Sequence, residues 1–261
     1  MNRRHWTRFR APLAGAFGLV VFLLLWELLV AAFDVKPYVL RAPSAILAEL
    51  ADTPGVYARA ALVTGWHALV GLAIALAAAL VLGTLLAASR FAEEAAAPVL
   101  TLVLVTPWVA YISSVVLWLG AGTRPVLFVV AFVSLPAFTF AMVTGLRSAD
   151  PAAQELLRSV DASAGEILWR LRLPSALPTL MSTARYSLGL ALAAAYFAEG
   201  AALSNQGLGA IGRRAQAFNE GDPLWASILC TALLGALGLA LITVAERILL
   251  RWHASQRRLG P

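Results

Sequence analysis

The sequence is poor in charged residues. Only 13% of its 261 residues are charged and 61% are hydrophobic, whereas a soluble domain usually carries about 25% charged residues. The mean hydropathy is +0.80. This composition excludes a water-soluble globule.

Reactive side chains are scarce as well. The single Cys230 cannot form an intrachain disulfide, and the single lysine, Lys36, stands in Val-Lys-Pro, so the phosphate-binding loop that ends in Gly-Lys-Ser/Thr is absent. The three histidines, His5, His67 and His253, have neither metal-ligand spacing nor an accompanying carboxylate cluster. We therefore expect no catalytic residue, no metal site and no cofactor. If ATP drives this protein, another chain hydrolyses it.

Apolar stretches long enough to cross a bilayer recur along the whole chain. A crossing helix needs about 20 apolar residues, and six stretches meet this condition: 11–33, 60–89, 95–123, 125–146, 179–203 and 223–245. The loops between them are too short for a separate soluble domain of usual size. We predict an all-α integral membrane protein, with one domain over residues 1–261 and about six transmembrane helices.

The basic residues are unevenly divided between the two sides of these spans. With the N-terminus inside, the inner segments hold thirteen basic residues and the outer segments hold six. Cytoplasmic loops are enriched in Lys and Arg, so we expect cytoplasmic tails at 1–10 and 251–261. A cleaved signal peptide is the alternative for the N-terminus, but the apolar run up to Phe33 is longer than the usual signal core of about 7–15 residues.

Small residues and prolines mark the expected helices. In 60–89 a small residue recurs every four positions, at Gly71, Ala75, Ala79, Gly83 and Ala87. Such a stripe lets another helix approach closely, although an alanine-rich helix also produces it by chance. Pro107 and Pro136 interrupt the third and fourth spans, and the resulting kinks serve either a pathway or packing alone.

The segment 147–178 is too polar to cross the membrane and lies on the expected cytoplasmic side. Asp150-Pro151 predicts a helix start. Ser163 and Glu166 predict a capping box that starts a second short helix, which we expect to end before Leu173-Pro174. This helix-turn-helix is either a passive interfacial loop or a docking element for a cytoplasmic partner.

Over roughly 41–252, the order and spacing of motifs resemble the inner-membrane permease subunits of binding-protein-dependent ATP-binding-cassette (ABC) importers, in the branch for nitrate, sulfonate, taurine and similar solutes. The cytoplasmic signature of that family begins at a glutamate, has a glycine six residues later and ends in Leu-Pro. Here it begins at Glu155, has Asp161 in place of the glycine and ends at Leu173-Pro174. Asp enters left-handed conformations less readily than Gly. Further matches are Thr64-x-x-His67-x-x-x-Gly71, Thr106-Pro107, Leu135-Pro136, Glu199 and Gly207-Leu-Gly209. Two positions depart from the family pattern: His67 stands where the family often has Arg, and Ser113 stands where it tends to have Pro.

The resemblance implies a permease that forms the translocation pathway for a small solute, with ATP hydrolysis in another chain. It implies as partners a second permease copy, expected here as a homodimer, a cytoplasmic ABC ATPase dimer, an extracytoplasmic substrate-binding protein and the lipid bilayer of the inner membrane, with no nucleic acid. The ATPase-coupling residues that it implies are Glu155, Leu156, Leu157, Arg158, Asp161, Gly165, Leu173 and Pro174.

Two ionisable residues lie inside the fifth expected span. Such groups normally face a protein interior or a cavity, so Glu199 and Arg185 join Pro107 and Pro136 as pathway candidates. Glu199 either hydrogen-bonds a neighbouring helix or belongs to the pathway or gate. A secondary transporter or channel that couples through such a carboxylate is the competing class, and it leaves the cytoplasmic helix-turn-helix unexplained. A membrane-embedded enzyme has no nucleophile and base here to support it.

Overall fold

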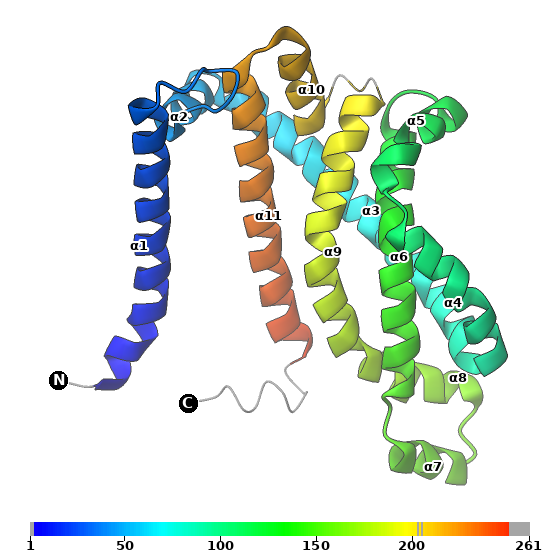
Figure 1. Cartoon of the computed structure of the whole chain (residues 1–261). Coiled ribbons are helices and arrows are strands. Elements are labelled where there is room, and N and C mark those ends of the chain that lie inside the picture. Colours follow the sequence, from blue (N-terminus) through cyan, green and yellow to red (C-terminus); the bar gives the residue numbers. More distant parts are fainter. Residues whose placement is uncertain (1–2, 203, 205, 251–261) are drawn as a thin grey trace.

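The computed structural model describes residues 3–202, 204 and 206–250, and every regular element in these ranges is helical (Figure 1). The prediction of an all-α membrane fold is confirmed. The expected tail 251–261 and the first two residues lie outside the described part. The elements are α1 (Arg3–Ala32), α2 (Pro43–Asp52), α3 (Pro54–Ala88), α4 (Arg90–Val105), α5 (Trp108–Leu119), α6 (Thr123–Arg147), α7 (Pro151–Ser159), α8 (Ala164–Ile167), a π-helical turn (Leu168–Arg172), α9 (Leu173–Ala201), α10 (Leu208–Phe218) and α11 (Gly221–Leu249).

Within the described residues, four helices are long and apolar enough to cross a membrane: α1, α3, α6 and α11. The third expected span, 95–123, is not one straight helix, because α4 and α5 meet at an angle of 96°. The bend falls at Pro107, which precedes the first residue of α5 and cannot donate a backbone hydrogen bond. The fifth expected span corresponds to α9, a 29-residue helix that carries both Arg185 and Glu199 and runs beside α6 (Figure 1).

The centre of the bundle consists of α3, α6 and α9. Two glycines of α3 touch α6 so closely that a side chain cannot fit. A Cβ at Gly83 would lie 2.6 Å from the Cβ of Met142, and one at Gly71 would overlap the Val130 side chain. Ala75 is 1% exposed and Ala79 is fully buried. The small-residue stripe predicted in 60–89 is therefore a close helix contact.

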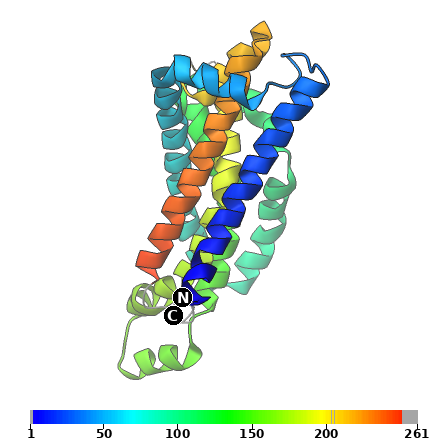
Figure 2. The ribbon, with the colours of Figure 1, turned by 90° about the vertical axis from the view of Figure 1, so that its left-hand side faces the viewer.

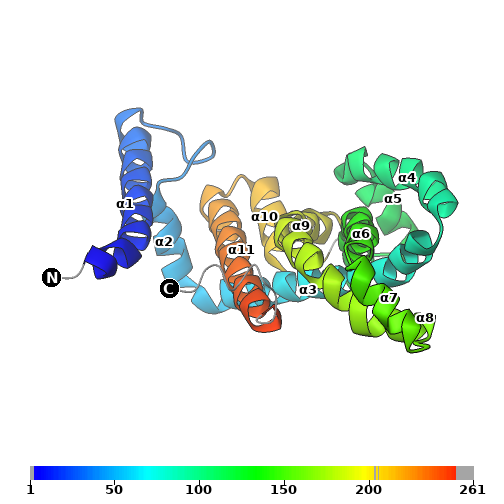
Figure 3. The ribbon, with the colours of Figure 1, turned by 90° about the horizontal axis from the view of Figure 1, so that it is seen from below.

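The N-terminal helix lies at the edge of the molecule. Seen from the end that carries α7 and α8, α11 separates α1 from α9 and α6 (Figure 3). One contact between α1 and α11 is an edge-on pair of Trp26 and Trp225, with ring centroids 5.8 Å apart. After α1 the chain forms the short helix α2, whose first residue is Pro43. Its Ser44 does not cap α2 but donates to Glu27 of α1, with the hydroxyl 2.6 Å from the carboxylate.

We expect the contact between α3 and α6 to limit the stability of the fold. In Gly83→Leu, the new side chain would collide with Met142, and overpacking of this kind costs about 1–3 kcal/mol. Thermal unfolding of the detergent-purified chain should therefore begin at a lower temperature. Gly18→Leu on α1 is the matched control, because a Cβ there meets nothing within 4 Å. Equal unfolding temperatures for the two variants would contradict this packing.

Candidate functional site

Both helix starts predicted in the segment 147–178 are confirmed. The Asp150 side chain accepts a hydrogen bond of 3.0 Å from the backbone of Ala152, and Pro151 is the first residue of α7. In α8, the Ser163 hydroxyl accepts from the backbone N–H of Glu166 at 3.2 Å, and the Glu166 carboxylate accepts from the backbone N–H of Ser163 at 3.0 Å. Because Ser163 donates to its charged form, the pKa of Glu166 lies below its usual value.

The turn between α7 and α8 is centred on Asp161. Its φ is +57°, in the left-handed region that glycine enters most easily. The chain closes around it through two backbone hydrogen bonds, from Asp161 to Arg158 at 3.1 Å and from Ala162 to Leu157 at 3.0 Å. Asp161 thus adopts the conformation that a glycine would supply at this position.

The expected end of the second helix before Leu173-Pro174 is wrong. After α8 the chain continues through the π-helical turn Leu168–Arg172 directly into α9, and the N–H of Leu173 donates to the carbonyl of Leu168. Pro174 is the second residue of α9 and follows this turn directly. A wide turn of this kind is tolerated inside a helix. The polar segment is therefore shorter than predicted and is joined to α9 as one helical unit.

The helix α7 lies beyond the lower ends of the long helices in both side views (Figures 1 and 2). Leu156 and Val160, one turn apart, are 67% and 68% exposed. Leu157, by contrast, is half-buried. Of the remaining candidates, Glu155, Arg158 and Gly165 are exposed, and Leu173 and Pro174 are half-buried.

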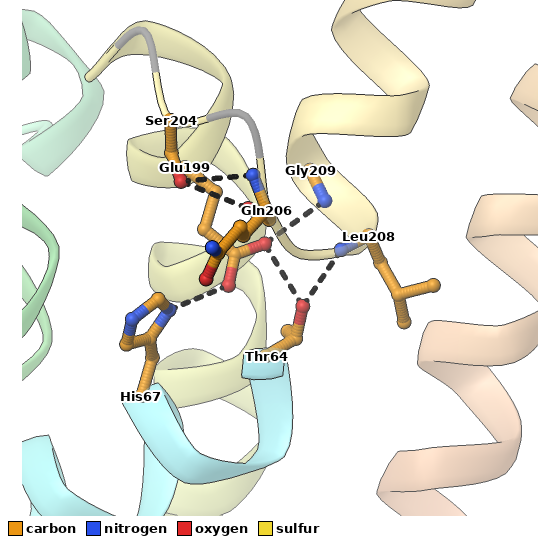
Figure 4. A network of polar contacts seen from close by, with 7 residues as sticks. All are labelled: Thr64, His67, Glu199, Ser204, Gln206, Leu208 and Gly209. Carbon is orange, nitrogen blue, oxygen red and sulfur yellow. Dashed lines mark hydrogen bonds and ion pairs between the residues drawn. The ribbon is translucent and has the colours of Figure 1, made fainter. Parts of the chain in front are cut away.

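At the opposite end of the molecule, the Glu199 carboxylate is fully buried among polar groups (Figure 4). It accepts a hydrogen bond of 2.8 Å from the Thr64 hydroxyl and one of 3.0 Å from the backbone N–H of Gly209. Its other oxygen lies 2.8 Å from Nδ1 of His67, which is 3% exposed. One carboxylate thus joins α9 to α3 and to the start of α10.

The chain before α10 is fitted to this network. Gly207 has a φ of +96°, and a Cβ there would collide with the Glu199 carboxylate. The next residue, Leu208, donates its N–H to the Thr64 hydroxyl at 2.9 Å. The contact of Thr64 and His67 with Glu199 was not predicted from the sequence. The available signal was their spacing of three residues, which places both on one face of an apolar helix.

Three cavities follow one another along a single face of α9. A groove of about 340 Å³ between α6 and α9 is lined by hydroxyl groups, a cleft of about 420 Å³ lies between α9 and α11, and a third of about 620 Å³ lies beside α10. The residues of α9 that line them recur every three or four positions: Thr179, Ser182, Thr183, Tyr186, Gly189, Leu192, Ala193, Tyr196, Phe197, Gly200 and Ala201. Tyr186 is 78% exposed. The part of this face beside the first groove, from Thr179 to Tyr186, is more polar than lipid contact favours.

The pathway candidates predicted from the sequence do not come together. Arg185 forms an ion pair with Glu246 of α11. Pro107 is exposed at the bend between α4 and α5, whereas Pro136 is buried inside α6. Two interpretations of Glu199 were given above, a hydrogen bond to a neighbouring helix and a place in the pathway or gate. The structure shows the hydrogen bonds, to α3 and α10.

Residues 79–251 match the family described as "Binding-protein-dependent transport system inner membrane component". The chain belongs to this family. It is 29% identical over 242 residues to the formylaminopyrimidine transport permease protein ThiX of Halalkalibacterium halodurans, covering 91% of this chain and 94% of that one. It is 26% identical over 156 residues to the taurine transport system permease protein TauC of Escherichia coli, covering 60% of this chain and 56% of that one.

The fold is similar to a chain of the MetNI methionine ABC transporter in an inward-facing conformation, with a TM-score of 0.59 and 17% identity over 74% of this chain and 97% of that one. The chain is therefore a multi-pass permease subunit of an ABC importer in the inner membrane. It is not itself an enzyme, and it works with a separate ATPase and a substrate-binding protein.

We expect the buried carboxylate to be essential for holding α10 in place. Glu199→Ala would leave the hydroxyl of Thr64, the ring of His67 and the N–H of Gly209 without their acceptor, and each buried polar group left unpaired costs about 1–3 kcal/mol. Glu199→Gln keeps one acceptor oxygen and should lose less. Thermal unfolding measures both effects. Glu94→Gln, at an exposed position of α4, is the control, and an unfolding temperature of Glu199→Ala equal to that of this control would refute the assignment.

Proposed function

We propose that α7 and α8 dock on the cytoplasmic ATPase and that α9 lines the solute pathway of a permease homodimer. The observation that carries the first part is the exposed apolar pair, Leu156 and Val160, on a helix beyond the ends of the spans. A membrane-spanning face needs no protein to cover its apolar residues, but this helix lies outside the spans. A partner surface would bury the pair.

The proposed docking sets the orientation of the chain. The start of α1 and the end of α11 lie at the same end of the molecule as α7 (Figure 1). With the ATPase at that end, both termini are cytoplasmic. The larger number of basic residues in the segments on that side supports the same orientation.

The face of α9 that carries the three cavities supports the second part. Ser182 and Tyr186 are exposed on it, and α6 and α11 flank it without covering it. Polar side chains at membrane depth normally face protein or a water-filled cavity rather than lipid. A second copy opposite this face would enclose such a cavity between the two chains. The pathway then runs along α9 from the outer cavity beside α10 to the hydroxyl-lined groove near α8.

The helical connection supplies a direct mechanical link between the two parts. ATP binding closes the ATPase dimer and moves the docked α7 and α8 as rigid bodies. Because α8, the π-helical turn and α9 are continuous, this motion passes to the pathway helix without an intervening flexible loop. Gln154 of α7 accepts a hydrogen bond of 3.3 Å from Arg172 in the turn, which ties α7 to the same unit.

We expect Leu156→Asp to release the ATPase or to uncouple its hydrolysis from uptake. A charge in the centre of an apolar contact costs several kcal/mol unless it is paired, so co-purification of the ATPase should fall at least about tenfold, which corresponds to about 1.4 kcal/mol. Val39→Asp, at a 58% exposed site between α1 and α2, is the control for insertion and folding. Normal ATPase retention and transport by Leu156→Asp would return the segment to a passive role.

The pathway assignment is tested by the reaction of single cysteines with a water-soluble maleimide. In a Cys230→Ala background, Ser182→Cys on α9 should be labelled in membranes, because the proposed pathway admits water. Leu25→Cys on α1, where the native side chain is 54% exposed, should remain unlabelled because it faces lipid. Equal labelling of both positions, or of neither, would count against a pathway along α9.

A further inference from the structure

The largest of the three cavities, the cleft beside α10, has two chemically different walls. At about 620 Å³ it falls in the size range of small-molecule sites. One wall is apolar and aromatic, with Val109 and Ile112 of α5 and Tyr196 and Phe197 of α9. The other wall is polar and includes Arg213 of α10.

The aromatic wall is built rigidly. The Tyr196 hydroxyl lies 2.9 Å from that of Ser227, and a Cβ at Gly212 would overlap this hydroxyl. Phe197 packs edge-on against Trp108, with ring centroids 5.7 Å apart. The rings therefore have fixed positions on which a planar or apolar group can lie.

The guanidinium of Arg213 is held over the cleft with most of its donors unused. Its Nη1 donates to the carbonyl of Gly200 at 2.8 Å, and a Cβ at Gly200 would stand only 3.3 Å from the Cβ of Arg213. A guanidinium has five N–H donors, and the structure shows one of them engaged. Arg213 forms no ion pair with any carboxylate of the described residues.

No acidic group among the residues that line the cleft neutralises the positive charge of Arg213. Of the residues that line it, none is acidic, and the nearby Glu199 directs its carboxylate to Thr64, His67 and the backbone N–H of Gly209. Gln216 and Ser113 add an amide and a hydroxyl group. Ser113 is one of the positions that departed from the expected family pattern, and a proline there would supply no hydroxyl.

We propose that this cleft is a solute subsite of the permease itself, which takes a small molecule with an anionic group bound by Arg213 and an aromatic or apolar body placed on Tyr196 and Phe197. Arg213 is thereby a specificity-determining residue. An arginine in a partly enclosed site suits carboxylate, sulfonate and phosphate groups because its donors can bind two oxygens at once. The inference rests on the proposed pathway along α9, at whose outer end the cleft lies.

Benzenesulfonate is a suitable probe, and benzyl alcohol is its neutral counterpart. Both are titrated, by ligand-observed NMR, into the purified permease with its co-expressed ATPase. Arg213→Gln should weaken benzenesulfonate binding about tenfold or more, since a charge-assisted pair is lost, and should leave benzyl alcohol binding nearly unchanged. Phe197→Ala should weaken the binding of both. Arg214→Gln, which removes the neighbouring charge outside the cleft, is the matched control and should have no effect.

Equal losses in Arg213→Gln and Arg214→Gln would overturn the subsite, because they would indicate general surface attraction. Absence of benzenesulfonate binding to the unsubstituted complex would overturn it as well. Unfolding temperature and ATPase retention are recorded on the same samples. If both arginine variants retain the ATPase and bind benzenesulfonate equally well, the subsite alone is refuted. The ATPase contact is tested separately by Leu156→Asp, in a measurement that involves no solute.

Discussion

Close backbone contact between α3 and α6 is the constraint on which the rest of the structure depends. Lipid chains are as apolar as leucine, so helices inside a bilayer gain little from burying hydrophobic side chains and associate through tight packing instead. The stripe from Gly71 to Gly83 supplies that packing between α3 and α6, and Gly145 of α6 meets Ala176 of α9 in the same way. With α3 and α9 both fixed against α6, their outer ends come within hydrogen-bonding distance. Only then can Glu199 reach Thr64 and His67.

Glu199 and Arg213 lie near each other but differ in exposure, because Glu199 is fully buried and Arg213 is exposed. The Glu199 side chain is fully buried and is hydrogen-bonded to a hydroxyl, an imidazole and a backbone N–H, because a buried polar group without partners is costly. Arg213 stays on the open side of α9 and α10, where its charge is still available to a ligand. The glycines at 200, 207 and 212 allow both arrangements by letting α9 and α10 approach each other.

The two ends of α9 lie in the two parts of the molecule for which functions are proposed above. At one end α9 continues into the π-helical turn and α8, and at the other it carries the Glu199 network and one wall of the Arg213 cleft. In the proposed mechanism, a motion that begins at α8 passes along α9 to the contacts that hold α10 and changes the shape of the cleft that α10 lines.

Composition and local spacing alone determined that the chain is an all-α membrane protein, that a small-residue stripe lies on the second span and that helices begin at Pro151 and at Ala164, because these features depend on nearest neighbours along the chain. The motifs also placed the chain in its family. Tertiary structure decided the bend between α4 and α5, the continuity of α8 with α9, the exposure of Leu156 rather than Leu157, and the pairing of Glu199 with His67, residues 132 positions apart. Such contacts depend on which helix faces are brought together, and single-sequence periodicity shows a face without its partner. The cleft beside α10 belongs to the same class, since its walls come from four helices that only the folded bundle assembles.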